Sequence, residues 1–266
     1  MGILNVTPDS FSDGGKFFAI ESAVKHAAQL VADGANILDI GAESTRPGHE
    51  TVTLEEESAR LLPVLREVRK CFPALKISVD TYKGELAKAA VEAGADIIND
   101  VWGGMRKIFF GENGLSTAEV SAHYDCPIIL MHNKPQETLP MHNLNAEIFT
   151  DFEKILENAN ALGVDPKNII LDGGFGFAKT PEQNIELLKN YGTLRRFGFP
   201  LLLGLSKKST LKKYFGEEAA AAATLAFDMW AACNKVCDII RIHDVTEHSR
   251  LLKPLDSIDD TIQWTN

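Results

Sequence analysis

Carboxylate and amide side chains stand at the ends of three short apolar runs, as Asp80, Asn99 and Asp172. A buried carboxylate must find hydrogen-bond donors or lose its charge. A flat heterocycle with an amidine-like edge supplies paired N–H groups to such a carboxylate. Lys208 follows a later apolar run and is suited to carbonyl or ring-nitrogen acceptors of the same ring. These four residues predict a binding site for a polar heterocycle.

Cationic side chains follow other apolar runs, as Arg46, Arg241 and His243. The planar fork of arginine suits phosphate, so we interpret these residues as a phosphate pole separate from the carboxylates. A Mg²⁺ ion held partly by Asn5 and mostly by ligand phosphates fits this pole, because that ion keeps few protein ligands. The expected ligand is a polar ring that carries a phosphate ester. For any single residue, the alternative is that it only caps a strand or begins a turn.

The elements that must position these residues alternate along the chain. Eight short runs rich in β-formers predict strands at residues 2–6, 36–40, 76–80, 96–100, 127–131, 168–172, 200–205 and 238–242. Helix-period stretches lie between and after them, at residues 20–33, 54–71, 84–93, 117–123, 146–162, 181–197, 217–235 and 247–262. Residues 103–116 fit no element cleanly.

Eight strand–helix units over residues 1–266 predict a single-domain α/β protein with the (β/α)8 TIM-barrel fold. A doubly wound parallel sheet is the alternative. The strands are continuously apolar, which is typical of parallel strands covered by helices. In a barrel the active site forms at the carboxyl ends of the strands, so the polar residues named above are expected at one mouth.

Composition and charge exclude several classes of function. The chain of 266 residues has 27 Lys and Arg against 37 Asp and Glu, a net charge of −10, which offers no basic surface for nucleic acid. No apolar run approaches the roughly 20 residues that span a bilayer, and the start lacks the pattern of a signal peptide. We therefore expect a cytoplasmic protein without a membrane partner. Its four cysteines show no C-x-x-C pair and are expected as reduced thiols, packed as small buried hydrophobes.

Three motifs are incomplete. Residues 173–180 approach the nucleotide loop G-x-x-x-x-G-K-[ST], but Ala178 replaces the second glycine. No G-x-G-x-x-G follows the first strand, which removes the main support for a dinucleotide fold. His132 and His142 do not have the spacing of a zinc site.

Eight blocks of sequence resemble the signatures of the dihydropteroate synthase family. Residues 5–15 (NVTPDSFSDGG) are similar to its first signature and residues 39–48 (DIGAESTRPG) to its second. Later blocks follow in order at residues 78–81 (SVDT), 98–100 (IND), 130–132 (LMH), 171–177 (LDGGFGF), 206–209 (SKKS) and 241–245 (RIHDV). The resemblance covers essentially the whole chain.

The resemblance implies a transferase of folate biosynthesis. Such an enzyme joins p-aminobenzoate to 6-hydroxymethyl-7,8-dihydropterin diphosphate and releases pyrophosphate and 7,8-dihydropteroate; it is a sulfonamide target and a homodimer. The implied contacts are Asp80, Asn99, Asp172 and Lys208 for pterin, Asn5, Arg46, Arg241 and His243 for diphosphate, and Phe11, Thr45, Pro47, Phe177 and Ser209 for p-aminobenzoate. Asn5 also touches Mg²⁺, and the implied catalytic residues are Asp13, Arg46, Lys208, Arg241 and His243. The arylamine proton has three candidate acceptors, namely water, pyrophosphate and Asp13.

One departure from the family pattern lies beside the expected pterin site. Gly173 stands where the family usually has proline after the aspartate of the sixth strand. Two alternative functions stay open. One is another pterin-binding barrel, a methyltetrahydrofolate methyltransferase, which needs no diphosphate pole. The other is a homologue that binds pterin or a partner without turnover.

Overall fold

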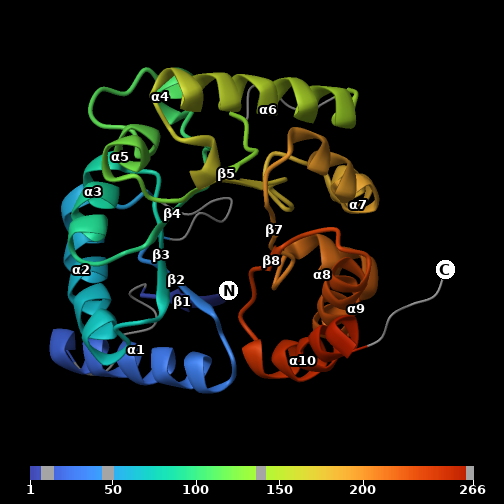
Figure 1. The fold of residues 1–266 in the computed structure, drawn as a ribbon, viewed down its shortest axis with the longest axis horizontal. Helices are drawn as coiled ribbons and strands as arrows, with labels where there is room; N and C mark the ends of the chain where they lie inside the picture. The colour runs from blue at the N-terminus through green and yellow to red at the C-terminus, as the bar shows by residue number, and fades with distance from the viewer. Residues whose placement is uncertain (7–14, 44–50, 136–141, 262–266) are drawn as a thin grey trace.

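The computed structural model describes residues 1–6, 15–43, 51–135 and 142–261. This part of the chain contains one sheet of eight parallel strands, which are neighbours in the order of the sequence. Helices surround the strands as a ring (Figure 1). The strands are β1 (Gly2–Asn5), β2 (Ile37–Gly41), β3 (Lys76–Asp80), β4 (Ile97–Asp100), β5 (Ile128–Met131), β6 (Ile169–Asp172), β7 (Leu201–Leu203) and β8 (Ile239–Ile240).

Helices follow the strands along the chain. They are α1 (Gly15–Ala32), α2 (Leu54–Cys71), α3 (Gly84–Glu92), α4 (Arg106–Phe110), α5 (Thr117–Tyr124), α6 (Leu144–Ala161), α7 (Pro181–Asn190), α8 (Ser209–Phe215), α9 (Ala220–Cys233) and α10 (Val245–Thr261), with 3₁₀ segments η3 (Pro166–Asn168) and η4 (Tyr191–Phe197). Capping boxes begin α2, α5 and α7, and the last of these uses Thr180 and Gln183. Such caps satisfy backbone donors that a helix start leaves free. None of the helices in the described ranges is long and apolar enough to cross a membrane.

The sheet closes on itself between the first and last strands. The Ile3 N–H donates to the Ile242 carbonyl over 2.9 Å, and the Ile242 N–H donates to the Met1 carbonyl over 3.0 Å. A parallel bridge joins Gly2 to Ile242 at the same place. The prediction of a (β/α)8 barrel is therefore confirmed, and the alternative of an open doubly wound sheet is wrong.

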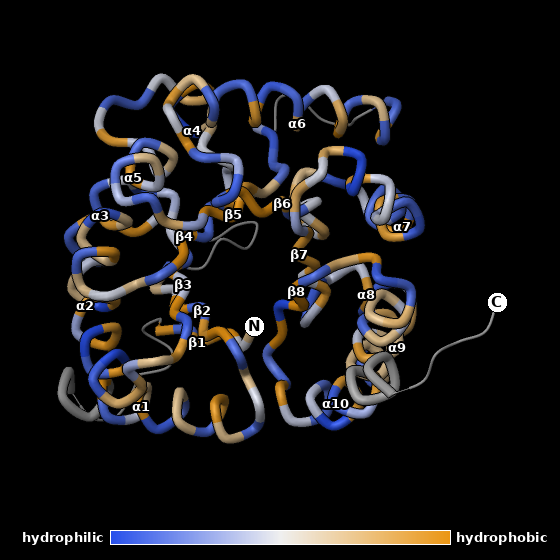
Figure 2. The backbone as a smooth tube through the Cα atoms, viewed as in Figure 1, coloured by the Kyte–Doolittle hydropathy of each residue, from blue (hydrophilic) through white to orange (hydrophobic). Residues whose placement is uncertain are grey.

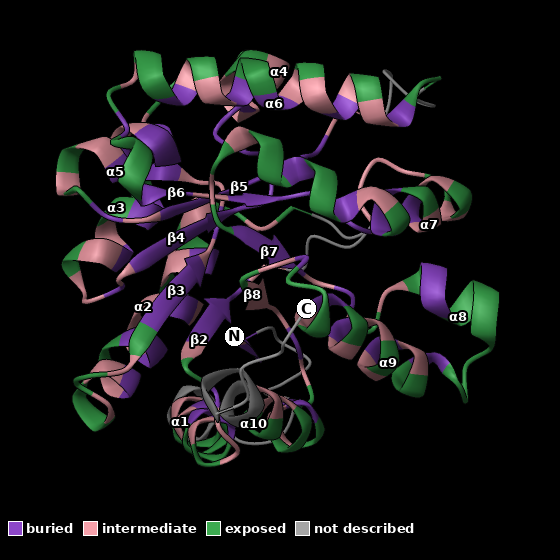
Figure 3. Cartoon of the chain, turned by 45° about the vertical axis from the view of Figure 1, so that its right-hand side comes forward, coloured by how far each residue is buried: buried purple, intermediate pink, exposed green. Residues whose placement is uncertain are grey.

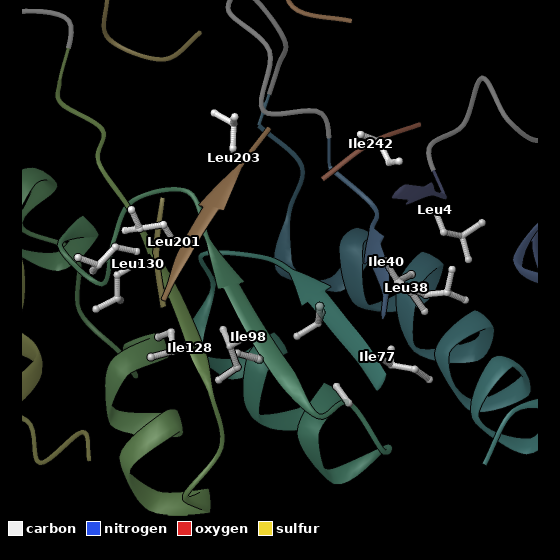
Figure 4. Close-up of a cluster of buried hydrophobic side chains, with 14 of the residues drawn as sticks. Leu4, Leu38, Ile40, Ile77, Ile98, Ile128, Leu130, Leu201, Leu203 and Ile242 are labelled. Atoms are coloured by element: carbon white, nitrogen blue, oxygen red, sulfur yellow. The ribbon is translucent and has the colours of Figure 1, made fainter. Parts of the chain in front are cut away.

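Alternate residues of each strand face opposite sides of the sheet, because successive side chains in a strand point to opposite faces. The outward residues pack with the helices into the main apolar cluster, which includes Leu38, Ile77, Ile98 and Leu201 (Figure 4). Figure 2 shows apolar residues along the strands, and Figure 3 shows most of the strands buried, while the surrounding helices carry exposed residues. The barrel is thus built around two separate apolar layers, one outside the sheet and one inside it.

The inner layer is small and changes from apolar to polar along the barrel. Ile97, Ile129 and Leu202 form a cluster inside the barrel, against which residues such as Ile239 pack. Two residues further along β4 comes Asn99, and two residues beyond Ile239 comes Arg241. The strand period of two therefore directs these polar side chains inward at the carboxyl ends of the strands, where the site is expected.

The structure differs from several predicted helix boundaries and from the predicted burial of the cysteines. The stretch 181–197 is not one helix, since α7 ends at Asn190 and a 3₁₀ segment follows. The helices α4 and α8 were not predicted, because each is shorter than the window over which helical periodicity becomes visible. The expectation of buried cysteines holds for Cys126 and is wrong for Cys71 and Cys233, which are exposed.

Candidate active site

Arg241 lies immediately after β8 and joins two carboxylates at the mouth of the barrel. Its Nε donates to Asp39 Oδ2 over 2.6 Å, and its Nη2 donates to Asp80 Oδ2 over 2.7 Å. The side-chain amide of Asn99 also donates to Asp39 Oδ2, over 3.1 Å. Strands β2, β3, β4 and β8 thereby supply one connected polar network, in which the guanidinium compensates buried negative charge.

Several buried oxygen atoms in and beside this network have no hydrogen-bond donor within the described residues. Within the described residues, Asp39 Oδ1, Asp80 Oδ1 and Ser78 Oγ are buried and have no hydrogen-bond partner. Burial raises the pKa of Asp80 to about 7, although the nearby Arg241 opposes that shift. Buried acceptors without donors cost free energy, so a ligand that brings N–H groups would be stabilised here. This is the chemistry expected for an amidine-like ring edge.

Asp172 ends β6 and faces the same mouth. Its Oδ1 accepts from the Gly174 N–H over 2.8 Å and lies 3.3 Å from the Tyr191 hydroxyl. Burial raises the pKa of Asp172, and the nearby Lys208 and Arg241 oppose that rise. A third carboxyl group is therefore fixed close to the cations of the site.

Lys208 lies over an aromatic ring from the loop that follows β6. Its Nζ is 4.0 Å from the centroid of the Phe177 ring, within the range of a cation–π contact. Its stem also passes close to Gly176, where an added Cβ would lie 2.9 Å from Lys208 Cδ. Phe177 and Lys208 thus place a candidate p-aminobenzoate contact beside a candidate pterin contact.

The remaining described candidates surround these residues. The His243 backbone N–H and Nδ1 lie 3.2 Å and 2.9 Å from Ser206 Oγ. The loop after β7 therefore contacts His243 in the segment beyond β8. Ser209 is exposed at the first position of α8. Asn5 is exposed at the end of β1. Phe11 and Asp13, together with Thr45, Arg46 and Pro47, lie outside the described residues.

One expectation from the sequence needs correction, and one carboxylate at a strand end lies away from the site. The cations were expected to form a pole separate from the carboxylates, yet Arg241 is bonded to Asp80 in the structure. The two sets interdigitate because β3 and β8 both direct these side chains into the same narrow barrel. Asp100, which also follows an apolar run, faces the helices instead, where its carboxylate binds Thr117 Oγ1 over 2.5 Å and the Trp102 N–H over 2.7 Å.

Three residues at the site had no binding role in the sequence analysis. Asp39 is one of the polar residues at the end of the second predicted strand and belongs to the second signature, and its position two residues after Ile37 in β2 places it on the inner face. Ser206 lies in the block 206–209, and its contact with His243 follows from the pairing of the neighbouring strands β7 and β8. Tyr191 lies inside a helix-period stretch, so no local pattern reveals that it reaches Asp172.

Comparisons with known proteins agree with this geometry. The family described as pterin binding enzyme matches residues 1–243. A dihydropteroate synthase of Clostridium beijerinckii is 43% identical over 260 residues, which cover 97% of this chain and 93% of that protein.

Two solved structures are also similar. The dihydropteroate synthase of Clostridium difficile, solved in the presence of pteroic acid, is 38% identical with a TM-score of 0.87, and the match covers 97% of this chain and 95% of that one. The dihydropteroate synthase of Xanthomonas albilineans, solved with 4-aminobenzoic acid, is 36% identical with a TM-score of 0.87. The match covers 99% of this chain and 93% of that one.

The family model matches residues 1–243 of this eight-stranded barrel, and the chain belongs to that family of pterin-binding enzymes. Within it, identity above 40% over nearly the full length places the chain among the dihydropteroate synthases. The resemblance noted in the sequence is thereby confirmed.

Proposed function

We propose that this chain condenses 6-hydroxymethyl-7,8-dihydropterin diphosphate with p-aminobenzoate to give 7,8-dihydropteroate and pyrophosphate. The arylamine nitrogen forms a bond to the pterin methylene carbon while the carbon–oxygen bond to the diphosphate breaks. The observation that carries the proposal is the pair of donor-less buried oxygens on Asp39 and Asp80, which lies beside the Arg241 guanidinium at one barrel mouth. A ligand with a hydrogen-bond donor edge and an anionic tail complements such a site.

The pterin side of the site consists of Asp80, Asn99, Asp172 and Lys208 in this proposal. Carboxylates accept paired N–H groups, and they also favour positive charge that spreads into the ring as pyrophosphate departs. Lys208 meets the acceptor atoms of the ring. These groups hold the ring in a fixed orientation before the reaction, so that little reorganisation is needed as charge develops.

The diphosphate side consists of Asn5, Arg46, Arg241 and His243. Arg241 is already ordered by Asp39 and Asp80, so in this proposal it exchanges part of its contact with Asp80 for a phosphate oxygen. Within the described ranges no group of three or more His, Cys, Asp or Glu side chains is arranged to hold a metal ion. A Mg²⁺ ion would therefore be held by Asn5 and mostly by the diphosphate. When bound, that ion neutralises charge on the leaving group.

The p-aminobenzoate side consists of Phe11, Thr45, Pro47, Phe177 and Ser209. The Phe177 ring lies under Lys208, which favours attack by the amine from the edge of the pterin site. Asp13 is proposed near the reacting centre, where it is one candidate acceptor of the arylamine proton. A sulfonamide resembles p-aminobenzoate in shape, so we expect it to compete for this side.

A release assay tests the proposal. Purified protein with Mg²⁺ and the pterin diphosphate should release pyrophosphate only when p-aminobenzoate is added, and a sulfonamide should raise the apparent KM for p-aminobenzoate. Pterin binding without any release above background would instead favour a non-catalytic homologue. Pyrophosphate release at the same rate with and without p-aminobenzoate would contradict the condensation reaction.

We further propose that residues 1–266 act as one domain, as a homodimer and in the cytoplasm. An apolar groove of about 420 Å³ between α7, α8 and α9 supports the dimer. Its lining includes Tyr214, Phe215 and Trp230, which expose 45%, 44% and 40% of their surface, and a contiguous exposed apolar patch marks an interaction site. The free cysteines are compatible with a reducing compartment.

A further inference from the structure

Tyr191 reaches the rear of the pterin site from the start of η4. The residue is fully buried, and its hydroxyl joins three groups from two strand ends. The Gly173 N–H donates to the hydroxyl oxygen over 2.9 Å, and the single hydroxyl proton has two acceptors within reach, the Leu202 carbonyl and, at 3.3 Å, Asp172 Oδ1. The ends of β6 and β7 are therefore connected through one phenol oxygen.

Gly173 and Tyr191 fit each other closely. A Cβ added at Gly173 would lie 2.7 Å from Tyr191 Cε2 and 3.2 Å from Leu194 Cδ1, and the first distance is too short for two carbon atoms. Space is the constraint here, since the backbone of Gly173 does not adopt a positive φ. Proline would add a ring in the same place and would also remove the N–H that the tyrosine accepts. The glycine is thus the partner that the buried ring requires.

The carboxyl group of Asp172 is held through one of its oxygens. Both the Gly174 N–H and the Tyr191 hydroxyl contact Oδ1, and both approach from loop and helix residues behind the strand end. We propose that Tyr191 is a positioning residue for pterin recognition, which donates its hydroxyl proton to Oδ1 of the Asp172 carboxylate so that Oδ2 faces the ligand. This inference rests on the proposed function for the identity of the ligand. It assigns to the Gly173–Tyr191 pair a role in specificity for the pterin.

The isosteric change Tyr191→Phe tests this inference, because it keeps the ring and removes only the hydroxyl. We expect the KM for the pterin diphosphate to rise about tenfold, as loss of one hydrogen bond to a charged group would give, while the KM for p-aminobenzoate stays within about twofold. Tyr124→Phe is the matched control, since that hydroxyl donates to Glu92 on the exposed surface. An unchanged KM for the pterin, or equal rises for both substrates, would overturn the positioning role.

A second experiment does not depend on turnover. Calorimetric titration with free 6-hydroxymethyl-7,8-dihydropterin measures affinity even if the chain releases no pyrophosphate, so failure of the proposed function is distinguishable from failure of this inference. Gly173→Ala should weaken pterin affinity strongly in the natural background and much less in the background of Tyr191→Leu, where the ring is gone. Equal effects of Gly173→Ala in the two backgrounds would show that the residues act independently, which overturns the pairing.

Discussion

Arg241 binds two carboxylates through different nitrogens and so keeps a cation in place inside an acidic barrel mouth. Its bonds to Asp39 and Asp80 come from strands that are distant in sequence. A chain with a net charge of −10 repels anionic substrates at long range. Binding of a diphosphate therefore depends on cations, such as Arg241, that are held in place at the site.

We expect Arg241→Ala to weaken binding of the pterin diphosphate at least about tenfold more than binding of the free pterin, since a charged contact to phosphate is lost only in the first case. Calorimetric titration with both ligands measures the two losses. Arg250→Ala is the matched control, because that guanidinium pairs with Glu247 on the surface. Equal losses for the two ligands would contradict a diphosphate role for Arg241.

Pterin affinity should depend on pH through Asp80. Its pKa is raised by burial to about 7, so the carboxyl is charged above that pH and neutral below it; Arg241, Asp39, Glu57 and Lys208 are the charged groups that act on it. Affinity for the free pterin should fall as pH decreases from 8 to 6, by at most about tenfold per pH unit. Asp80→Asn should bind weakly at every pH, and a pH dependence that persists in this variant would refute the assignment.

At the scale of elements, the loop after β6 positions ligand groups through a half-buried lysine, Lys179. Lys179 Nζ donates to the carbonyls of Gly174 and Phe177 over 3.1 Å and 3.0 Å, and lies 3.0 Å from His132 Nδ1. Burial lowers the pKa of Lys179 to about 7. At Gly174, which has a φ of +69°, an added Cβ would lie 2.0 Å from the His132 carbonyl oxygen. These contacts stabilise the loop conformation that places Phe177 under Lys208.

Lys179→Met should disturb this loop. We expect a loss of about 2 to 3 kcal/mol in the free energy of unfolding, because two carbonyls lose their donor inside the protein. The KM for p-aminobenzoate should also rise, since Phe177 is no longer fixed. Urea denaturation and steady-state kinetics measure the two effects. Lys154→Met, at an exposed position of α6, should change neither, and a Lys179→Met variant as stable as the natural chain would contradict the anchoring role.

The strand pattern predicts most of the fold because each parallel strand is a continuous apolar run that ends in polar residues. For the same reason Asp80, Asn99, Asp172 and Arg241 could be placed at one mouth from sequence alone. The spatial detail could not be predicted in the same way. The ion pair of Arg241 with Asp80 depends on barrel closure, and the fit of Tyr191 against Gly173 depends on packing between residues 18 positions apart.

At the scale of the whole molecule, the apolar groove on α7, α8 and α9 bears on assembly. Trp230 lines this groove and exposes 40% of its surface. If the groove is the dimer contact, Trp230→Glu should convert a dimer of the natural chain to a monomer, because a charge buried without a partner is costly. Light scattering after size-exclusion chromatography measures the mass. A natural chain that is monomeric at micromolar concentration would contradict the proposed homodimer, whereas a variant that stays dimeric would place the contact elsewhere.

Barrel closure also determines the stage of protein synthesis at which the site can form. Arg241 meets Asp39 across 202 positions of sequence, and the final strand hydrogen-bonds to the first. A nascent chain that emerges from the ribosome in order carries the acids of β2 and β3 long before the cation that balances them. Until residue 241 is released from the exit tunnel, those acids lack this counter-ion, so the complete site forms only after the last strand has been synthesised.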